Sequence, residues 1–227
     1  MTGRAVLALV FAAGGLGATF GVRSWLHWRA TGSTGYRGIS GRPLSLPWWG
    51  GALFVGAVGL IVIAPVLVLV DLTQPMGALD GDAFAVIGLL LAAGSLVGVV
   101  VAQQGMGSSW RVGVDDSEHT GLVTSGVFRS VRNPIFTAMV LAVAGLALLI
   151  PTWVSLAALA ALMTAVERQV RVIEEPYLVR RHGQAYRSYA AQAGRFVPRL
   201  GLNLSASAAA VHPLDGVAAE AGGSVVR

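Results

Sequence analysis

The sequence predicts an all-α integral membrane protein. Five transmembrane helices are expected, of which the last two form a C-terminal helical hairpin, and a cytoplasmic helical extension follows them. Of the 227 residues, 55% are hydrophobic and only 12% are charged, whereas a soluble domain carries about 25% charged residues. Several uncharged runs approach the roughly 20 residues that a helix needs to cross a bilayer core. The length suits a single domain, and the arginines gather in alternate connections between the runs.

The first three spans are predicted from single uncharged runs. They are expected at Ala5–Val22, Trp48–Val70 and Ala83–Ala102. A signal peptide is the competing interpretation of the first run. Against it, no small-x-small cleavage site follows, and Trp25-Leu-His-Trp28 is typical of an aromatic anchor at the membrane interface. We therefore expect a retained helix.

The last two spans are predicted as a tight hairpin. Pro134–Ile150 and Thr152–Val166 are separated only by Pro151. As one helix of about 33 residues they would extend about 50 Å, too long for a hydrocarbon core of about 30 Å. Because proline removes a backbone donor, it favours a break.

The arginine distribution predicts the orientation. One arginine precedes the first run, four follow it, none lies between the second and third runs, and three lie between the third and fourth. Seven more lie between Arg168 and Arg199. The positive-inside rule then places the N-terminus outside and the C-terminus in the cytoplasm. It also accounts for the net charge of +5 without nucleic-acid binding.

Beyond the last span, the apolar stripe predicts a helix that continues to about Arg181 and ends at His182-Gly183, with the glycine as a cap. Gln184–Gln192 is expected to form another short helix. The membrane domain is therefore assigned to residues 1–200. Residues 201–227 are rich in Ala, Gly and Ser and are predicted to be a disordered tail.

Composition excludes several kinds of site. The chain has no cysteine, so it lacks a disulfide framework and a thiol nucleophile. Its four histidines are scattered without ligand spacing, so no metal site is predicted. No G-x-G-x-x-G fingerprint is present in a βαβ unit, which excludes a Rossmann-type cofactor domain.

Two polar clusters flank the predicted hairpin on its cytoplasmic side. In the first, Arg132-Asn133-Pro134 opens a helix, whose free N–H groups suit an anionic ligand. The alternative is a plain helix start with an interfacial arginine. In the second, Arg171 is spaced to share one helical face with Glu167, Glu174 and Glu175. That face is either a salt-bridged surface, or it turns one carboxylate towards a ligand.

The order and spacing of these motifs resemble the isoprenylcysteine carboxyl methyltransferase family. More broadly, they resemble the intramembrane methyltransferases that include phospholipid N-methyltransferases. The resemblance covers roughly Trp110–Leu200. It rests on His119-Thr-Gly-Leu-Val-Thr-Ser-Gly-Val-Phe128, Arg132-Asn-Pro-Ile-Phe136, Glu174-Glu175 and Gly183-x-x-Tyr186-x-x-Tyr189 with Pro198.

The resemblance implies S-adenosylmethionine as a methyl donor bound at the cytoplasmic face. The helix start with Arg132 would hold the methionine carboxylate, and Glu174 would accept hydrogen bonds from ribose or amino groups. Phe128 and Phe136 would pack against the adenine and the sulfonium. The implied contacts are His119, Thr120, Gly121, Leu122, Val123, Phe128, Arg132, Asn133, Pro134, Ile135, Phe136 and Glu174.

This sequence departs from the family pattern at several positions. Asn133 stands where the family has histidine, and Phe128 and Phe136 stand where it has tyrosine. The enzymes that act on prenylcysteine hold the substrate carboxylate with an arginine at the position of Val170. Arg171 or Arg168 would have to replace it. The methyltransferase is therefore better indicated than the prenylcysteine acceptor.

The predicted function is a methyltransferase, dependent on S-adenosylmethionine, that acts on a lipophilic acceptor at the cytoplasmic membrane face. A carboxylate acceptor would need a cation, Arg171 or Arg168. An amine or hydroxyl acceptor would need a base, Glu175 or Glu167. The acceptor is expected to be a lipid, a lipid-modified molecule, a quinone or another lipophilic small molecule in a bacterial cell membrane. Oligomeric state stays open.

Two other functions compete with this prediction. Membrane sterol reductases resemble the family in their C-terminal half and bind NADPH, so a reductase of that type is the alternative enzyme. A transporter or scaffold ranks last, because a transport path calls for charges within the spans, and none is found there.

Overall fold

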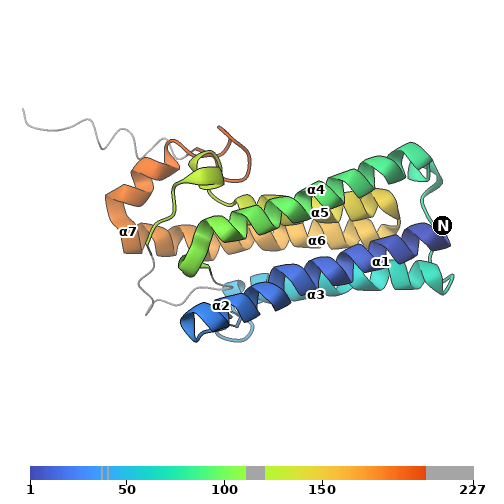
Figure 1. Ribbon diagram of the computed structural model, residues 1–227, viewed down its shortest axis with the longest axis horizontal. Coiled ribbons are helices and arrows are strands. Elements are labelled where there is room, and N and C mark those ends of the chain that lie inside the picture. Colours follow the sequence, from blue (N-terminus) through green and yellow to red (C-terminus); the bar gives the residue numbers. More distant parts are fainter. Residues whose placement is uncertain (37, 40, 111–120, 203–227) are drawn as a thin grey trace, which may run out of the picture.

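A computed structural model describes residues 1–36, 38–39, 41–110 and 121–202. Within these ranges the chain forms helices and connections without a strand ladder, and an isolated bridge joins Val131 to Gly194. Figure 1 shows α1, α3, α4, α5 and α6 side by side along the long axis, with α7 at the end opposite the N-terminus. The predicted tail, apart from its first two residues, lies outside the described residues.

The first helical run is longer than the sequence predicted. α1 (Thr2–Leu16), the π-helical turn η1 (Gly17–Val22) and α2 (Arg23–Thr31) follow one another without a break. We predicted an end at Val22 and a loop from Arg23. No residue from Arg23 to Thr31 breaks the helix. The run therefore stops only at Gly32, whose φ of 76° provides the left-handed C-cap.

The next two helices lie close to the predicted spans. α3 (Leu46–Leu69) begins at Ser45, whose hydroxyl accepts from the Trp48 N–H, and it continues through Pro65. α4 (Asp82–Met106) follows the short 3-10 turn η2 (Gly77–Leu79). Together with the Thr2–Thr31 run, these are the three helices in the described residues that are long and apolar enough to cross a membrane. This supports a membrane protein with several apolar helices.

α5 (Pro134–Leu149) and α6 (Trp153–Arg168) pack against each other. The chain turns between them at Ile150–Thr152, where the Ser155 hydroxyl donates to the carbonyl of Ile150 at 2.8 Å. Each helix has 16 residues, about 24 Å at 1.5 Å per residue, which is shorter than the bilayer core. The count of five spans therefore stays a prediction.

Close backbone approach packs α4 against α5. A Cβ added to Gly88 would lie 2.5 Å from the carbonyl oxygen of Gly145, and one added to Gly145 would lie 2.6 Å from the Ala92 nitrogen. Small residues at a helix crossing replace large side chains with direct backbone contact. This packing fixes α5, whose first turn carries part of the predicted site.

After α6 the helix continues through a second π-helical turn, η5 (Gln169–Glu174), into α7 (Glu175–Ala190). Gly183 interrupts α7 with φ 53° and ψ −124°, which confirms the predicted end at His182-Gly183. Two 3-10 turns, η3 (Gly107–Ser109) and η4 (Gly126–Arg129), flank the connection between α4 and α5.

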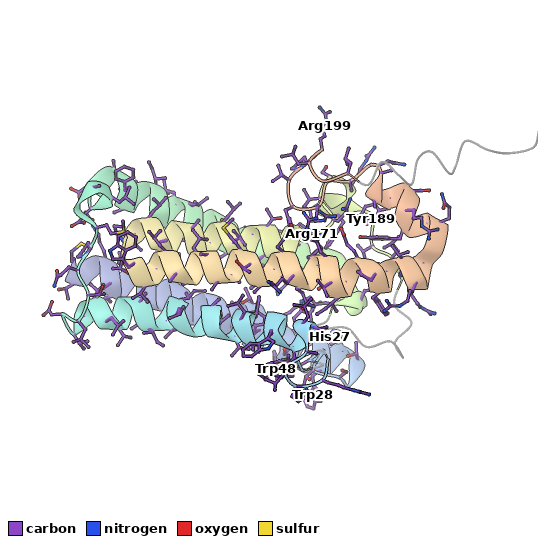
Figure 2. The ribbon with its side chains drawn as sticks, turned by 180° about the vertical axis from the view of Figure 1, so that it is seen from behind. His27, Trp28, Trp48, Arg171, Tyr189 and Arg199 are labelled. Carbon is purple, nitrogen blue, oxygen red and sulfur yellow. The ribbon has the colours of Figure 1, made fainter. Side chains whose placement is uncertain are left out.

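The two ends of the bundle differ in charge. At the N-terminal end, Arg4 pairs with Asp80 in the connection before α4 and with Asp82, the first residue of α4. The opposite end carries α2, α7 and most of the arginines. In Figure 2 the side chains of Arg171, Tyr189 and Arg199 lie at the same end as those of His27 and Trp48.

Candidate functional site

A cavity of about 520 Å³ lies at the arginine-rich end of the bundle. Its walls come from η1, α3, α4, the connection before α5, and the helix from η5 into α7. The structure therefore brings the first polar cluster and the two adjacent glutamates of the second to one cavity. The predicted site residues that line it are Gly121, Leu122, Val123, Phe128, Arg132, Asn133, Pro134, Ile135, Phe136, Glu174 and Glu175.

One predicted site residue among those described, Arg171, does not line the cavity. His119 and Thr120 lie outside the described residues. Arg171 lies on the exposed side of the helix, where its Nε donates to the Glu167 carboxylate, and half of its side chain is exposed. Arg171 therefore does not line this cavity, and its role in positioning an acceptor carboxylate stays a prediction.

The π-helical turn explains why Arg171 does not share one helical face with Glu174 and Glu175. The Glu175 N–H bonds the carbonyl of Val170, five residues back, so η5 holds one residue more per turn than an α-helix. The 3.6-residue spacing that placed Glu174 and Glu175 on one face with Arg171 does not hold here. Val170, which occupies the position of the family's arginine, is completely buried.

Arg132 is the centre of a buried ionic network. Its Nη1 donates to the carbonyls of Ala190 and Ala193 at 2.8 and 2.7 Å, and its Nη2 donates to Glu175 Oε1 at 2.9 Å. Arg195 donates to both oxygens of Glu175 at 2.8 and 2.9 Å. The outer nitrogens of Arg132 therefore hold the protein's own chain.

Glu175 is consequently a structural carboxylate. Burial raises its pKa, but the hydrogen bonds and positive charges of Arg195 and Arg132 outweigh burial and hold the pKa of Glu175 below its ordinary value. A carboxylate that is paired with two guanidinium groups is a poor proton acceptor. The prediction of Glu175 as a catalytic base is therefore not supported by its surroundings.

Residues 190–201, which we call the C-terminal clasp, contact the loop before α5 through backbone groups. We call this loop, residues 121–133, the site loop. The Arg132 N–H donates to the carbonyl of Gly194 at 2.8 Å, and the Gly194 N–H donates to that of Ser130 at 3.0 Å. Both the backbone and the side-chain amide of Asn133 donate to the carbonyl of Arg195. The Thr137 hydroxyl donates to the Phe196 carbonyl at 2.7 Å. The clasp thus fixes the start of α5.

The start of α5 offers donors to an anionic ligand. Pro134 opens the helix, and the backbone N–H groups of Ile135 and Phe136 belong to a first turn that has no intrahelical acceptors. The Nε atom of Arg132 is buried and has no partner among the described residues. A carboxylate bound at this corner would receive the helix donors and the positive charge of Arg132.

The opposite side of the polar wall carries an acceptor among aromatic rings. Glu174 Oε1 accepts from Gln169 Nε2 at 3.3 Å, and both residues line the cavity. The rings of Tyr186 and Tyr189 lie edge to face at 6.2 Å, and the Tyr189 hydroxyl donates to the carbonyl of Phe128. Such a wall suits hydroxyl or amino groups beside a flat ring or a cation.

Sequence reasoning missed several lining residues. Trp110 is almost fully buried and touches the His27 ring. Gln103, at the end of α4, also lines the cavity, and His182 enters it at the break in α7. The helix stop at Gly183 was a signal for His182, whereas Trp110 and Gln103 follow the third predicted span and carried no motif. The others come from helices that looked like plain spans.

Fold and site define this molecule as a membrane-embedded helical protein with a ligand cavity at its polar end. Residues 83–185 match the family model of phospholipid methyltransferases. This segment is therefore similar to a family of membrane methyltransferases that includes the isoprenylcysteine carboxyl methyltransferases, and the match is consistent with the predicted family. No curated protein and no solved structure matches the chain.

Proposed function

We propose that the protein is a methyltransferase, dependent on S-adenosylmethionine, that methylates a lipophilic acceptor at the cytoplasmic membrane face. The observation that carries this proposal is the convergence of Gly121–Val123, the start of α5 and Glu174 on one cavity. Glu174 lies far from the other two elements in the sequence. Each belongs to the segment that matches the family of membrane methyltransferases.

The polar wall has a complementary group for each part of the methyl donor. The start of α5 with Arg132 would receive the methionine carboxylate, Glu174 would accept from ribose or amino groups, and Phe128 and Phe136 would flank the flat and cationic parts. The bound donor supplies an activated methyl group on its sulfonium. The protein then contributes alignment and the exclusion of water.

The proposed topology has the N-terminus outside, the cavity at the cytoplasmic face, and α5 and α6 as the fourth and fifth spans of a membrane domain over residues 1–200. Support comes from charge: Arg4 pairs with aspartates at one end, whereas Arg132, Arg171 and Arg195 belong to the other. Positive charge is enriched on the cytoplasmic side of membrane proteins.

The acceptor is proposed to be held mainly by its apolar part. Arg171 points outward, Val170 is buried, and the outer nitrogens of Arg132 are committed to the chain. The described wall therefore offers a weak clamp for an acceptor carboxylate, which disfavours a prenylcysteine. For an amine or hydroxyl acceptor, the carboxylate of Glu174 and the imidazole of His182 line the cavity as proton-accepting groups.

Calorimetry on the detergent-purified protein tests the methyl donor. We expect S-adenosylmethionine to bind, and Glu174→Ala to weaken binding about tenfold or more, the usual loss for a hydrogen bond to a charged group. Glu167→Ala is the matched control, because Glu167 pairs with Arg171 at the surface. The proposal fails if the wild-type protein does not bind S-adenosylmethionine, or if it binds NADPH instead.

A further inference from the structure

One limb of the cavity is built almost entirely from apolar side chains of η1 and α3. Phe20 contributes from η1, and Gly51, Phe54, Val55 and Val58 contribute from α3. The α3 positions follow the i, i+3, i+4, i+7 spacing that places side chains on one helical face. We call these five residues the apolar limb. It runs about 10 Å along α3.

Two aromatic rings bridge the walls of this limb. Phe20 and Phe54 lie edge to face, with ring centroids 6.5 Å apart and planes at 81°, a favourable aromatic geometry. Behind Phe54 lies a buried cluster that includes Ala57, Val143 and Leu162. The pair therefore has a solid backing, and its size sets the room that the limb leaves.

The position of Phe20 is itself fixed. The side-chain amide of Gln103 donates to the carbonyl of Thr19 at 2.9 Å, and the Thr19 hydroxyl donates to the carbonyl of Gly15 at 2.7 Å. Both bonds are buried and lie at the π-helical turn η1. A turn that is locked next to Phe20 keeps its ring at the limb, so the limb is a preformed binding surface.

The limb reaches the outer surface of the bundle. Val55 lines the cavity and is 57% exposed, at the middle of a helix apolar enough to span a membrane. A group that leaves the cavity beside Val55 enters hydrocarbon rather than water. The limb thus joins the polar wall to the bilayer interior.

We propose that the apolar limb binds the hydrocarbon chain of the acceptor next to its reacting head, and that the Phe20–Phe54 pair determines which chains fit. This inference rests on the proposed function and names the part of the chain that selects the acceptor. All five limb residues lie outside the segment that matches the family, residues 83–185. Acceptor selection therefore belongs to a region that the family match does not include.

Photolabelling in lipid nanodiscs tests the limb. The probe is a C16 alcohol with a diazirine at carbon 6, so that the reactive carbon falls within the first 10 Å of chain. We expect wild-type labelling on peptides that contain Phe54, Val55 or Val58. Phe54→Trp fills the limb and should lower that labelling about tenfold, the scale on which small changes in an apolar pocket discriminate. Phe84→Trp on α4, outside the limb, should not.

A second variant and a second readout separate the possible failures. Phe54→Ala should raise labelling by a methyl-branched probe of the same length, because it widens the limb. Equal labelling of Phe54→Trp, Phe54→Ala and wild type by both probes overturns the inference. Donor binding is measured on the same samples and should not change. Its absence from the wild type defeats the proposed function, whereas intact donor binding without limb labelling defeats only the inference.

Discussion

The two walls of the cavity are held in place by different forces. The polar wall, residues 121–136 with Glu174, is fixed by the C-terminal clasp through backbone hydrogen bonds and by the Arg132–Glu175–Arg195 network. The apolar wall, which consists of the apolar limb, is fixed by contact between rings and by burial, as in the Phe20–Phe54 pair. Hydrogen bonds are directional, whereas burial is not.

This difference predicts how each wall tolerates change. Removing one partner of a buried hydrogen bond leaves the other unsatisfied, which costs more than the bond itself contributed. Apolar swaps that conserve volume usually cost under about 1.5 kcal/mol. The polar wall therefore tolerates few sequences, while the apolar wall can change its selectivity and keep the fold. The family match begins at residue 83 and thus includes only part of the cavity.

The largest expected effect is that of Arg132→Met. This change leaves the carbonyls of Ala190 and Ala193 without their donors and Glu175 with one guanidinium instead of two. Breaking a buried ion pair from one side costs about 3 to 5 kcal/mol. Equilibrium unfolding in mixed micelles measures it. Arg171→Met removes an exposed ion pair and should lower the free energy of unfolding by under about 1 kcal/mol. Equal losses of unfolding free energy in the two variants would contradict the difference between the buried and the exposed pair.

Gly194→Ala tests the clasp without touching a charge. A Cβ at Gly194 would lie 1.9 Å from the carbonyl oxygen of Val197, so the backbone must move. We expect a loss of about 3 kcal/mol, at the upper end of the range for overpacking. Gly56→Ala in α3 is the control, because a Cβ there meets nothing within 4 Å. A stable Gly194→Ala protein would show that the clasp is not rigid.

The smallest of the three effects is a pH dependence. Burial, with the negative charge of Glu175, raises the pKa of Tyr186 to about 12 from an ordinary 10. Below pH 10 this tyrosine is protonated in both the folded and unfolded states, so its titration does not lower the free energy of unfolding. Between pH 10 and 12 the unfolded state loses its proton first, so stability falls.

Tyr186→Phe should remove about 2 to 3 kcal/mol of this alkaline loss in the unfolding free energy, at 1.36 kcal/mol per pKa unit. Tyr36→Phe changes an exposed tyrosine and serves as the control in the same titration. If both variants follow the wild-type curve above pH 10, burial of Tyr186 does not contribute to the stability of the polar wall.

Helix positions and breaks were predictable because their signals are local. The polar pair His182-Gly183 follows an apolar stripe, and the helix breaks there at Gly183. The apolar runs of α3 and α4 are long enough to be recognised as spans from the sequence. The convergence of the loop with Glu174 was also predictable, because the charge distribution placed both on one side. The end of the first helix was not, since a π-helical turn at Gly17–Val22 has no sequence signature.

The roles of individual charges were harder to predict. Arg132 was expected to face a ligand, but its outer nitrogens donate to backbone carbonyl oxygens of the clasp. Every residue has such a carbonyl, so the sequence gives no sign of which ones accept these hydrogen bonds. Glu174 and Glu175 are adjacent and look equivalent in the sequence. Adjacent positions on a helix point in different directions, so Glu174 accepts from Gln169 at the cavity wall whereas Glu175 accepts from Arg195. Such a choice depends on partners far along the chain.

The clasp also has a consequence for biosynthesis. A chain is made from its N-terminus, so the site loop leaves the ribosome long before Gly194 and Arg195 do. Until those residues dock, Arg132 and Asn133 lack the backbone acceptors that hold them. The polar wall is therefore completed only after α6 and α7 have been made, and a nascent protein with its membrane helices in place still has an unfinished cavity.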